Sequence, residues 1–219
     1  MPAVSHRPRR FRAIIFDLDQ VLLARESAWR YAIEEAVIAV TGRRVDARAL
    51  AGEYHLRPWR HALSILVPNA EDGARCETLC VEMFRRSAMK KLLVHEGMGM
   101  ALDAVRGERV EMGAISREPH VVALRQMQST GLDRFIAVLS ATAEGKTWQP
   151  AGRIAECLAF LDAEPARAAF VSGDGFGLAE AAGGGLVPVF AGWAGQPTVE
   201  GVRRLEAPGA LGGLAGEAG

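Results

Sequence analysis

Short apolar runs alternate with helical patterns along much of the chain. The first run, AIIF at residues 13–16, is continuous, which is typical of a strand buried on both faces of a parallel sheet. Helical segments such as 121–128 and 154–161 separate the later runs of this kind. Those later runs lie at 110–115, 135–139, 168–171 and 186–190. Strands that alternate with helices predict right-handed βαβ units and a parallel sheet.

The last of these runs contains a proline. Pro188 has no backbone N–H to donate to a neighbouring strand, and prolines within strands are confined mainly to the edges of sheets. We therefore expect the strand at 186–190 to lie at an edge of the sheet.

A long segment after the first strand has a helical pattern throughout. Apolar residues recur at helical spacing over residues 27–41, and a second helical pattern runs over 74–94. No convincing strand is found between 24 and 105. We predict an α/β fold whose open parallel-sheet, Rossmann-like core comprises residues 11–23 and 106–206. An all-helical cap is then inserted at 24–105, small enough to act as a lid over the sheet.

The two ends of the chain are expected to be flexible tails. Residues 1–10 are polar and basic, and residues 207–219 are rich in glycine and alanine. Within the second of these segments, Leu211 and Leu214 could pack back against the core.

The composition is that of a folded protein with no overall charge. The chain has 49% hydrophobic residues, and its 26 Lys and Arg residues balance 26 Asp and Glu residues. No net field therefore attracts nucleic acid or an anionic membrane, and we expect neither as a partner. No apolar run is long enough to span a bilayer, and no export signal is recognised, so a cytoplasmic location is expected.

The cysteines do not form a metal-binding or disulfide pattern. There are three in all, and none lies in a CxxC motif or beside a histidine at metal-ligand spacing. Cys76 and Cys80 are four residues apart in a helical pattern, which favours small core-facing side chains over a metal pair or a disulfide.

Polar residues follow several of the predicted strands. Asp17 and Asp19 follow the first strand, Ser116 the second and Asp174 the fourth, and Lys146 lies beyond the third. In an open parallel sheet the ligand site lies outside the carboxyl ends of the strands, so these side chains are expected to converge on one rim. Two acids, a hydroxyl, a cation and a further acid suit phosphoryl transfer to an aspartate with a divalent cation.

Each of these residues also has a simpler interpretation. Ser116 could cap the helix that follows it, Asp174 could belong to a turn, and Lys146 could be a solvated surface charge. Asp17 and Asp19 are different, because two carboxylates directly after a buried strand are costly unless they are paired or bound to a metal. A functional role is therefore favoured most strongly for these two residues.

Four short motifs resemble those of the haloacid dehalogenase superfamily, in the phosphatase branch with a helical cap after the first strand. Their order along the chain is that of the family, and each lies at the end of a predicted strand. They are DLDQVL at 17–22, resembling DxDG(T/V)L; GAISR at 113–117, resembling a strand that ends in Ser or Thr; GKTWQP at 145–150, resembling GKPxP; and VSGD at 171–174 before a helix, resembling GDxxxD.

The resemblance implies a role for each site residue. Asp17 would be the nucleophile, Asp19 the general acid and then the general base, and Ser116 and Lys146 would hold the phosphoryl oxygens, with Lys146 also offsetting repulsion between the carboxylates and the phosphate. Asp17, Asp19 and Asp174 would bind Mg²⁺. The substrate would be a small phosphorylated metabolite, such as phosphoglycolate or a sugar phosphate, and a phosphomutase is the nearest alternative activity.

Several positions depart from the family pattern. Leu178 replaces the second acid of the fourth motif, Gln20 replaces the usual glycine, and Thr147 and Gln149 replace prolines of the lysine loop. If Leu178 faces the metal, magnesium binding should be weakened, and Leu178→Asp should restore it. The alternative from another functional class is a catalytically degraded member that binds a phosphorylated ligand or a protein partner without turnover.

Overall fold

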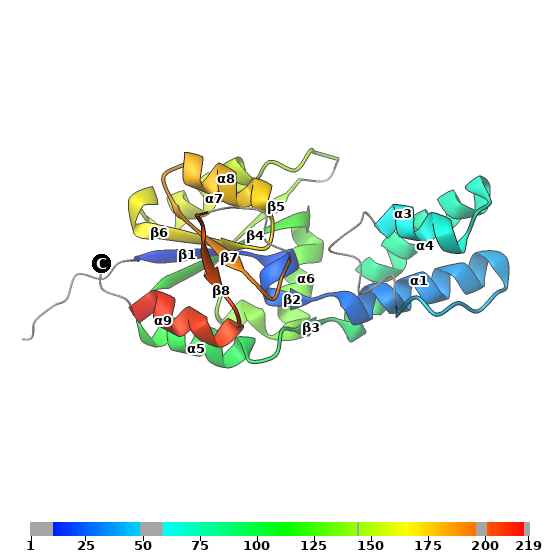
Figure 1. Ribbon diagram of the computed structural model, residues 1–219, viewed down its shortest axis with the longest axis horizontal. Coiled ribbons are helices and arrows are strands. Elements are labelled where there is room, and N and C mark those ends of the chain that lie inside the picture. Colours follow the sequence, from blue (N-terminus) through cyan, green and yellow to red (C-terminus); the bar gives the residue numbers. More distant parts are fainter. Residues whose placement is uncertain (1–10, 49–58, 144, 196–200, 217–219) are drawn as a thin grey trace, which may run out of the picture.

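Six parallel strands form the central sheet of the computed structural model, which describes residues 11–48, 59–143, 145–195 and 201–216 (Figure 1). The strand order is β5-β4-β1-β6-β7-β8, so the first strand lies inside the sheet, as its continuous apolar run predicts. The strands are β1 (Ala13–Asp17), β4 (Glu111–Pro119), β5 (Val138–Thr142), β6 (Ala168–Ser172), β7 (Val187–Ala191) and β8 (Arg203–Leu205). The predicted α/β class with an open parallel sheet is confirmed.

The expectation that the proline-containing strand lies at the edge of the sheet is wrong. β7 pairs with β6 on one side and with β8 on the other, and β8 is the edge strand. Pro188 itself pairs with Phe170, whereas the pairing with β8 begins one residue later, at Val189. The proline is tolerated because β8 does not extend alongside it, so no ladder hydrogen bond is lost on that side.

Helices cover both faces of the sheet, and alternate residues of β1 point to opposite faces. Ile15 packs in the cluster that includes Ile154 and Leu178, under α7 (Pro150–Phe160) and α8 (Gly175–Gly183). Ile14 and Phe16 pack in the larger cluster on the other face. That cluster receives side chains from α5 (Met98–Gly107), α6 (His120–Thr130) and α9 (Leu211–Gly216).

The cap is a separate group of helices that extends away from the sheet (Figure 1). It contains α1 (Glu26–Thr41), α3 (Trp59–Leu66), α4 (Ala70–Arg85) and a short 3-10 helix at Ser87–Lys91. Its own apolar cluster contains Ile33, Val37 and Leu63, together with two cysteines. This second small core packs the cap helices against one another, while Trp29 and Phe84 of the cap belong to the larger cluster that includes the sheet.

The cysteines behave as predicted. Cys76 and Cys80 are free and buried on α4, and their thiol groups lie 3.7 and 3.6 Å from the carbonyl oxygens of Ala36 and Ala32 on α1. Burial raises the pKa of the Cys80 thiol to about 12, so it stays protonated near neutral pH. These side chains pack α4 against α1.

A small antiparallel ribbon joins the cap to the core. β1 runs into a π-helical turn at Leu18–Leu22, and β2 (Leu23–Ala24) then pairs with β3 (Leu93–Val94). β3 lies in the segment for which no strand was expected, and the helical pattern predicted to reach residue 94 ends earlier. With only two residues, β3 is too short for its pattern to show a period of two.

The boundaries of the core differ from the predicted ones at two places. α5 was expected in the cap, but it lies beside α9 and away from the cap helices (Figure 1), with Met98 and Leu102 buried. The predicted tail at 207–219 instead forms a 3-10 turn and α9, whose Leu211 and Leu214 are fully buried. A Cβ atom at Gly212 would lie 3.0 Å from the Ala104 side chain, so the glycine allows α9 to lie close against α5. Residues 1–10 and 217–219 lie outside the described residues.

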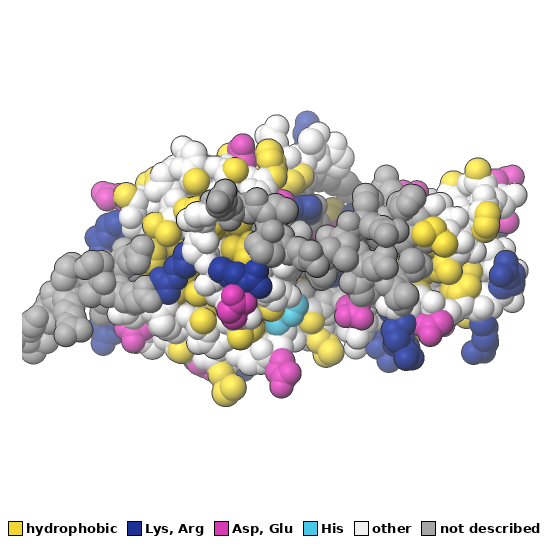
Figure 2. Space-filling model, viewed as in Figure 1, with side chains coloured by type: hydrophobic (Ala, Val, Ile, Leu, Met, Phe, Trp, Pro, Cys, Tyr) yellow, Lys and Arg dark blue, Asp and Glu magenta, His cyan; other side chains and the backbone are white. Residues whose placement is uncertain are grey.

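Charges of both signs are mixed on the surface. On the face shown in Figure 2, Lys and Arg side chains are interspersed with Asp and Glu side chains, which agrees with the equal numbers of the two in the sequence. Among the described residues, no helix combines the length and apolar character needed to cross a membrane.

Candidate functional site

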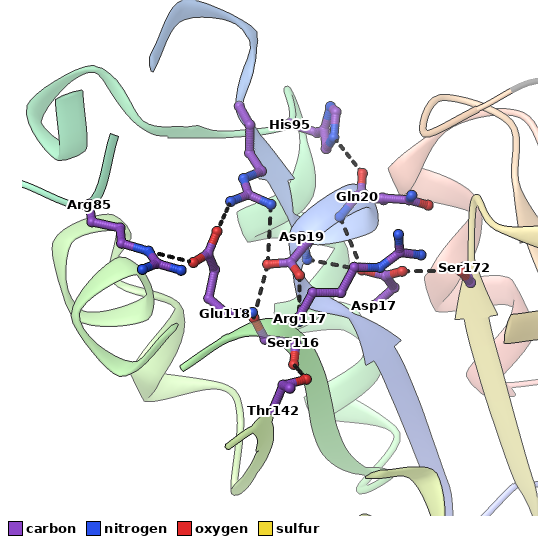
Figure 3. Close-up of polar contacts among 11 residues, drawn as sticks. Asp17, Asp19, Gln20, Arg85, His95, Ser116, Arg117, Glu118, Thr142 and Ser172 are labelled. Carbon is purple, nitrogen blue, oxygen red and sulfur yellow. Dashed lines mark hydrogen bonds and ion pairs between the residues drawn. The ribbon is translucent and has the colours of Figure 1, made fainter. Parts of the chain in front are cut away.

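Asp17 is held in a fixed orientation at the carboxyl end of β1 (Figure 3). Its Oδ1 accepts hydrogen bonds from the backbone N–H groups of Asp19, at 3.0 Å, and Gln20, at 3.2 Å. Its Oδ2 accepts a hydrogen bond from the Ser172 hydroxyl at 3.3 Å. The π-helical turn after β1 supplies the two amide donors, because Asp17 is the cap of that turn. The side chain is only 2% exposed.

The surroundings of Asp17 disfavour its charged form. Burial, followed by the negative charge of Asp19, raises the pKa of Asp17 to about 7, while the nearby Arg117 guanidinium acts in the opposite direction. A carboxyl group with this pKa changes its protonation state near neutral pH, which ordinary aspartates do not. Such a shift beside a specific cation is a property of functional sites.

Asp19 is fixed by residues from three other positions. Its Oδ1 accepts a hydrogen bond from the Ser116 hydroxyl at 3.0 Å and lies 3.4 Å from Nη1 of Arg25, and its Oδ2 accepts from the Arg117 backbone N–H at 2.7 Å. Ser116 does not cap α6, because that helix begins at His120 after the N-cap residue Pro119 and has no side-chain cap. The structure thus brings Asp17, Asp19 and Ser116 together, as the sheet topology predicts.

Arg117 is a member of the site that the sequence reasoning missed. Its Nη2 donates to Asp174 Oδ2 at 2.7 Å, and its guanidinium carbon lies 5.2 Å from the centre of the Trp148 ring. The only signal in the sequence is that Arg117 directly follows Ser116 at the end of a strand. A pattern of residue types does not show where so long a side chain points.

Asp174 has two roles in the structure. Its Oδ1 accepts from the backbone N–H of Phe176 and so caps α8, while its Oδ2 pairs with Arg117. The simpler interpretation of Asp174, as a residue of the turn before a helix, is therefore correct in part.

Lys146 is not brought to Asp17. Its side chain is exposed and makes no hydrogen bond or ion pair with another described residue. It lines a cavity of about 440 Å³ beside Thr142 and Arg153. The loop at 145–150, which carries Lys146, contacts the site through Trp148 instead. The Trp148 ring lies against the Arg117 guanidinium. The predicted role of Lys146 in holding a phosphoryl group stays a prediction.

Leu178 does not face the site. It is fully buried on α8, in the cluster that contains Phe170 and Ile115. The condition under which Leu178→Asp would restore magnesium binding, that this leucine faces the metal, is therefore not met, because the helix that Asp174 caps buries position 178 against the sheet.

The side chains of the site do not fit the predicted magnesium ion. The Arg117 guanidinium pairs with the carboxylate of Asp174, the residue that would complete the metal site with Asp17 and Asp19. In the described parts of the chain, no three His, Cys, Asp or Glu side chains are grouped so that they could hold a metal ion. The acid that the fourth motif would add is replaced by the buried Leu178.

An ion-pair cluster links the site to the cap. Glu118 of β4 pairs with Arg25 at 2.9 Å and with Arg85 of α4 at 3.1 Å (Figure 3). Arg25 precedes α1, is 5% exposed and lies over the ring of Phe84, at 4.5 Å from its centre. Because Arg25 also pairs with Asp19, the position of the cap is coupled to that carboxylate.

Glu118→Gln is expected to lower the free energy of unfolding by about 1–3 kcal/mol, because it leaves the buried Arg25 with one fewer anionic partner. Urea unfolding measures the change. The control is Glu82→Gln, which removes an exposed pair with Arg86 in the cap and should cost less than about 0.5 kcal/mol. Equal, small losses for the two variants would show that the cluster does not hold the cap to the core.

Comparison with solved structures shows the haloacid dehalogenase fold. No family model matches the sequence, and no curated protein matches it. A hydrolase of the haloacid dehalogenase superfamily from Geobacter sulfurreducens is 18% identical, covers 97% of this chain and 100% of its own, and has a TM-score of 0.78. A putative beta-phosphoglucomutase from Thermotoga maritima is 19% identical, with coverages of 93% and 98% and a TM-score of 0.73. A putative phosphoglycolate phosphatase from Lactobacillus plantarum is 16% identical, with coverages of 90% and 96% and a TM-score of 0.69.

Proposed function

The chain has the haloacid dehalogenase fold, and from its site we propose that it hydrolyses a small phosphate monoester through an aspartyl-phosphate on Asp17. The observation that carries this proposal is the placement of Asp17. Two backbone amides hold Oδ1, and the other oxygen lies beside a hydroxyl and close to a cation. A carboxylate held in this way is oriented for attack without having to reorganise.

The reaction has two steps. In the first, the proton that the Asp17–Asp19 pair carries moves to Asp19, an ionised oxygen of Asp17 attacks phosphorus, the bond from phosphorus to the ester oxygen breaks, and Asp19 gives that proton to the leaving oxygen. In the second, Asp19 takes a proton from water, which attacks the phosphorus and releases inorganic phosphate and the Asp17 carboxylate. Ser116 and the Arg117 backbone N–H keep Asp19 in place during both proton transfers.

The substrate that we propose is a phosphoglycolate-like or sugar-phosphate-like metabolite. The support is the likeness in fold to proteins described as a phosphoglycolate phosphatase and a beta-phosphoglucomutase, which is an analogy of fold. Release of inorganic phosphate from a panel of monoesters, including phosphoglycolate and glucose phosphates, tests the proposal. If the phosphoryl group is instead recovered on a second sugar phosphate and no inorganic phosphate is released, the enzyme is a mutase.

A second candidate function is ligand binding without turnover. It is favoured by the exposed position of Lys146 and the buried position of Leu178, since neither supplies the charge that the family motifs imply. The panel separates the two candidates, because a binding protein would be stabilised against thermal unfolding by a monoester that it does not hydrolyse.

Asp19→Asn is expected to lower kcat by about 10²- to 10⁴-fold for alkyl phosphates, which need a proton on the leaving oxygen. For p-nitrophenyl phosphate the loss in the first step should be much smaller, because its leaving group is stable as an anion. Stopped-flow release of p-nitrophenol measures that step. Equal losses for the two substrates would contradict the role of Asp19 as general acid.

A further inference from the structure

Three segments far apart in the chain fix the guanidinium of Arg117 beside Asp17. Asp174 accepts from Nη2 at 2.7 Å, the ring of Trp148 stacks at 5.2 Å, and the Arg117 backbone N–H is bonded to Asp19 at 2.7 Å. Figure 3 shows the Arg117 side chain reaching across to Asp17. Residues of the first, third and fourth motif segments therefore all contribute to the position of one cation, which the second segment carries.

The Arg117 guanidinium is fixed in position and still has N–H donors for a ligand. Among the described residues, Nη2 is the only guanidinium nitrogen of Arg117 that has an acceptor, and the side chain is 42% exposed. Nε and Nη1 therefore remain to meet a ligand from solvent. A guanidinium offers planar, paired N–H donors that match two oxygens of a phosphoryl group, which a lysine ammonium does not.

The charges of the site indicate that Arg117 supplies the positive charge that a metal ion would otherwise supply. Asp174 is engaged with Arg117, and the position of the further acid is the buried Leu178. A divalent cation placed at Asp174 would displace the guanidinium or be repelled by it. An incoming phosphate needs a positive partner beside Asp17 and Asp19. Arg25 is buried and pairs with both Asp19 and Glu118, so the fixed cation that a ligand can reach from solvent is Arg117.

We propose that Arg117 is the resident cation of this site, and that it binds the phosphoryl group directly, with no requirement for Mg²⁺. The inference deepens the proposed function and rests on it for the identity of the ligand as a phosphoryl group. It differs from the sequence expectation, in which Asp17, Asp19 and Asp174 share a magnesium ion.

Calorimetric titration with inorganic phosphate tests the proposal. In EDTA the parent protein should bind phosphate, and replacing EDTA with millimolar Mg²⁺ should change the dissociation constant less than twofold. Arg117→Gln should weaken binding in EDTA by about 10- to 100-fold, because charge-assisted hydrogen bonds are lost. The control is Arg125→Gln, which removes an exposed arginine of α6 and should bind as the parent does.

Arg117→Lys keeps the charge and loses the paired donors, so its affinity should lie between those of the parent and Arg117→Gln. Circular dichroism of each variant shows whether it is folded. Phosphate binding that requires Mg²⁺, or that Arg117→Gln retains in EDTA, would overturn the proposal, as would no binding to the parent under either condition. Phosphate binding in EDTA without hydrolysis of any monoester would leave this inference standing and contradict the proposed function.

Discussion

Asp17→Asn is expected to abolish phosphatase activity and to stabilise the fold above neutral pH. Activity is lost because an amide is not a nucleophile toward phosphorus, while the side chain keeps its shape and its Oδ1 acceptor. In the parent, activity should rise as the pH increases through about 7, because Asp17 must be ionised to attack. A pH profile of kcat/KM measured with p-nitrophenyl phosphate checks the second point.

The stability effect has a definite sign. The pKa of Asp17 is about 7 in the folded protein and near 3.8 when unfolded, so the folded state binds more protons between these values. The parent therefore loses stability as the pH rises through this window, by up to about 4 kcal/mol, whereas Asp17→Asn does not. Urea unfolding at pH 4 and pH 8 measures the free energy of unfolding of both proteins. The value for Asp17→Asn should increase relative to that of the parent only at the higher pH. A constant difference would contradict the raised pKa.

Leu178→Asp is expected to unfold the protein rather than to create a metal site. The substitution places a carboxylate among Ile115, Phe170 and Ile154, where no described side chain can pair with it. The cost of burying the group, charged or protonated, together with the lost apolar contacts is about 4 kcal/mol or more, a large part of the stability of a typical domain. Thermal unfolding followed by circular dichroism measures the loss.

A matched control lies one residue away on the same helix. Ala179→Asp introduces the same side chain on the exposed face of α8, and it should change the free energy of unfolding by less than about 0.5 kcal/mol. If Leu178→Asp were as stable as Ala179→Asp and bound Mg²⁺, the leucine would face the site and the packing described here would be wrong.

The sheet and the acids at its rim could be predicted because buried parallel strands leave a plain signal. The run at 13–16 is apolar at every position, and Asp17 and Asp19 follow it immediately. The carboxyl ends of parallel strands meet at one edge, so the convergence of these acids with Ser116 follows from topology alone.

Elements stabilised by tertiary contacts could not be predicted in this way. β8 is three residues long and two of them are arginines, so it has no apolar run. α9 contains three glycines, which disfavour a helix, and it forms because Leu211 and Leu214 pack against the core. Both elements depend on surfaces that exist only once the rest of the sheet has formed.

The contribution of Arg117 to the site could not be predicted for a related reason. Lys146 is the lysine of the third motif, whereas Arg117 only follows the serine of the second, so residue types alone favour the lysine. The outcome depends on side-chain direction: Trp148 of the lysine loop packs toward the site, and the lysine is left in solvent. Two long basic side chains can each reach a nearby carboxylate, and packing decides between them.

Chemical trapping of the intermediate tests the phosphatase proposal most directly. Asp19→Asn should accumulate the aspartyl-phosphate when it is mixed with p-nitrophenyl phosphate, because the first step needs no proton and the second lacks its base. Acid quenching followed by borohydride reduction converts an aspartyl-phosphate to homoserine, which peptide mass spectrometry locates. The account predicts homoserine at position 17, and none after the same treatment without substrate. Release of p-nitrophenol with an unmodified Asp17, or with the modification at another residue, would contradict it.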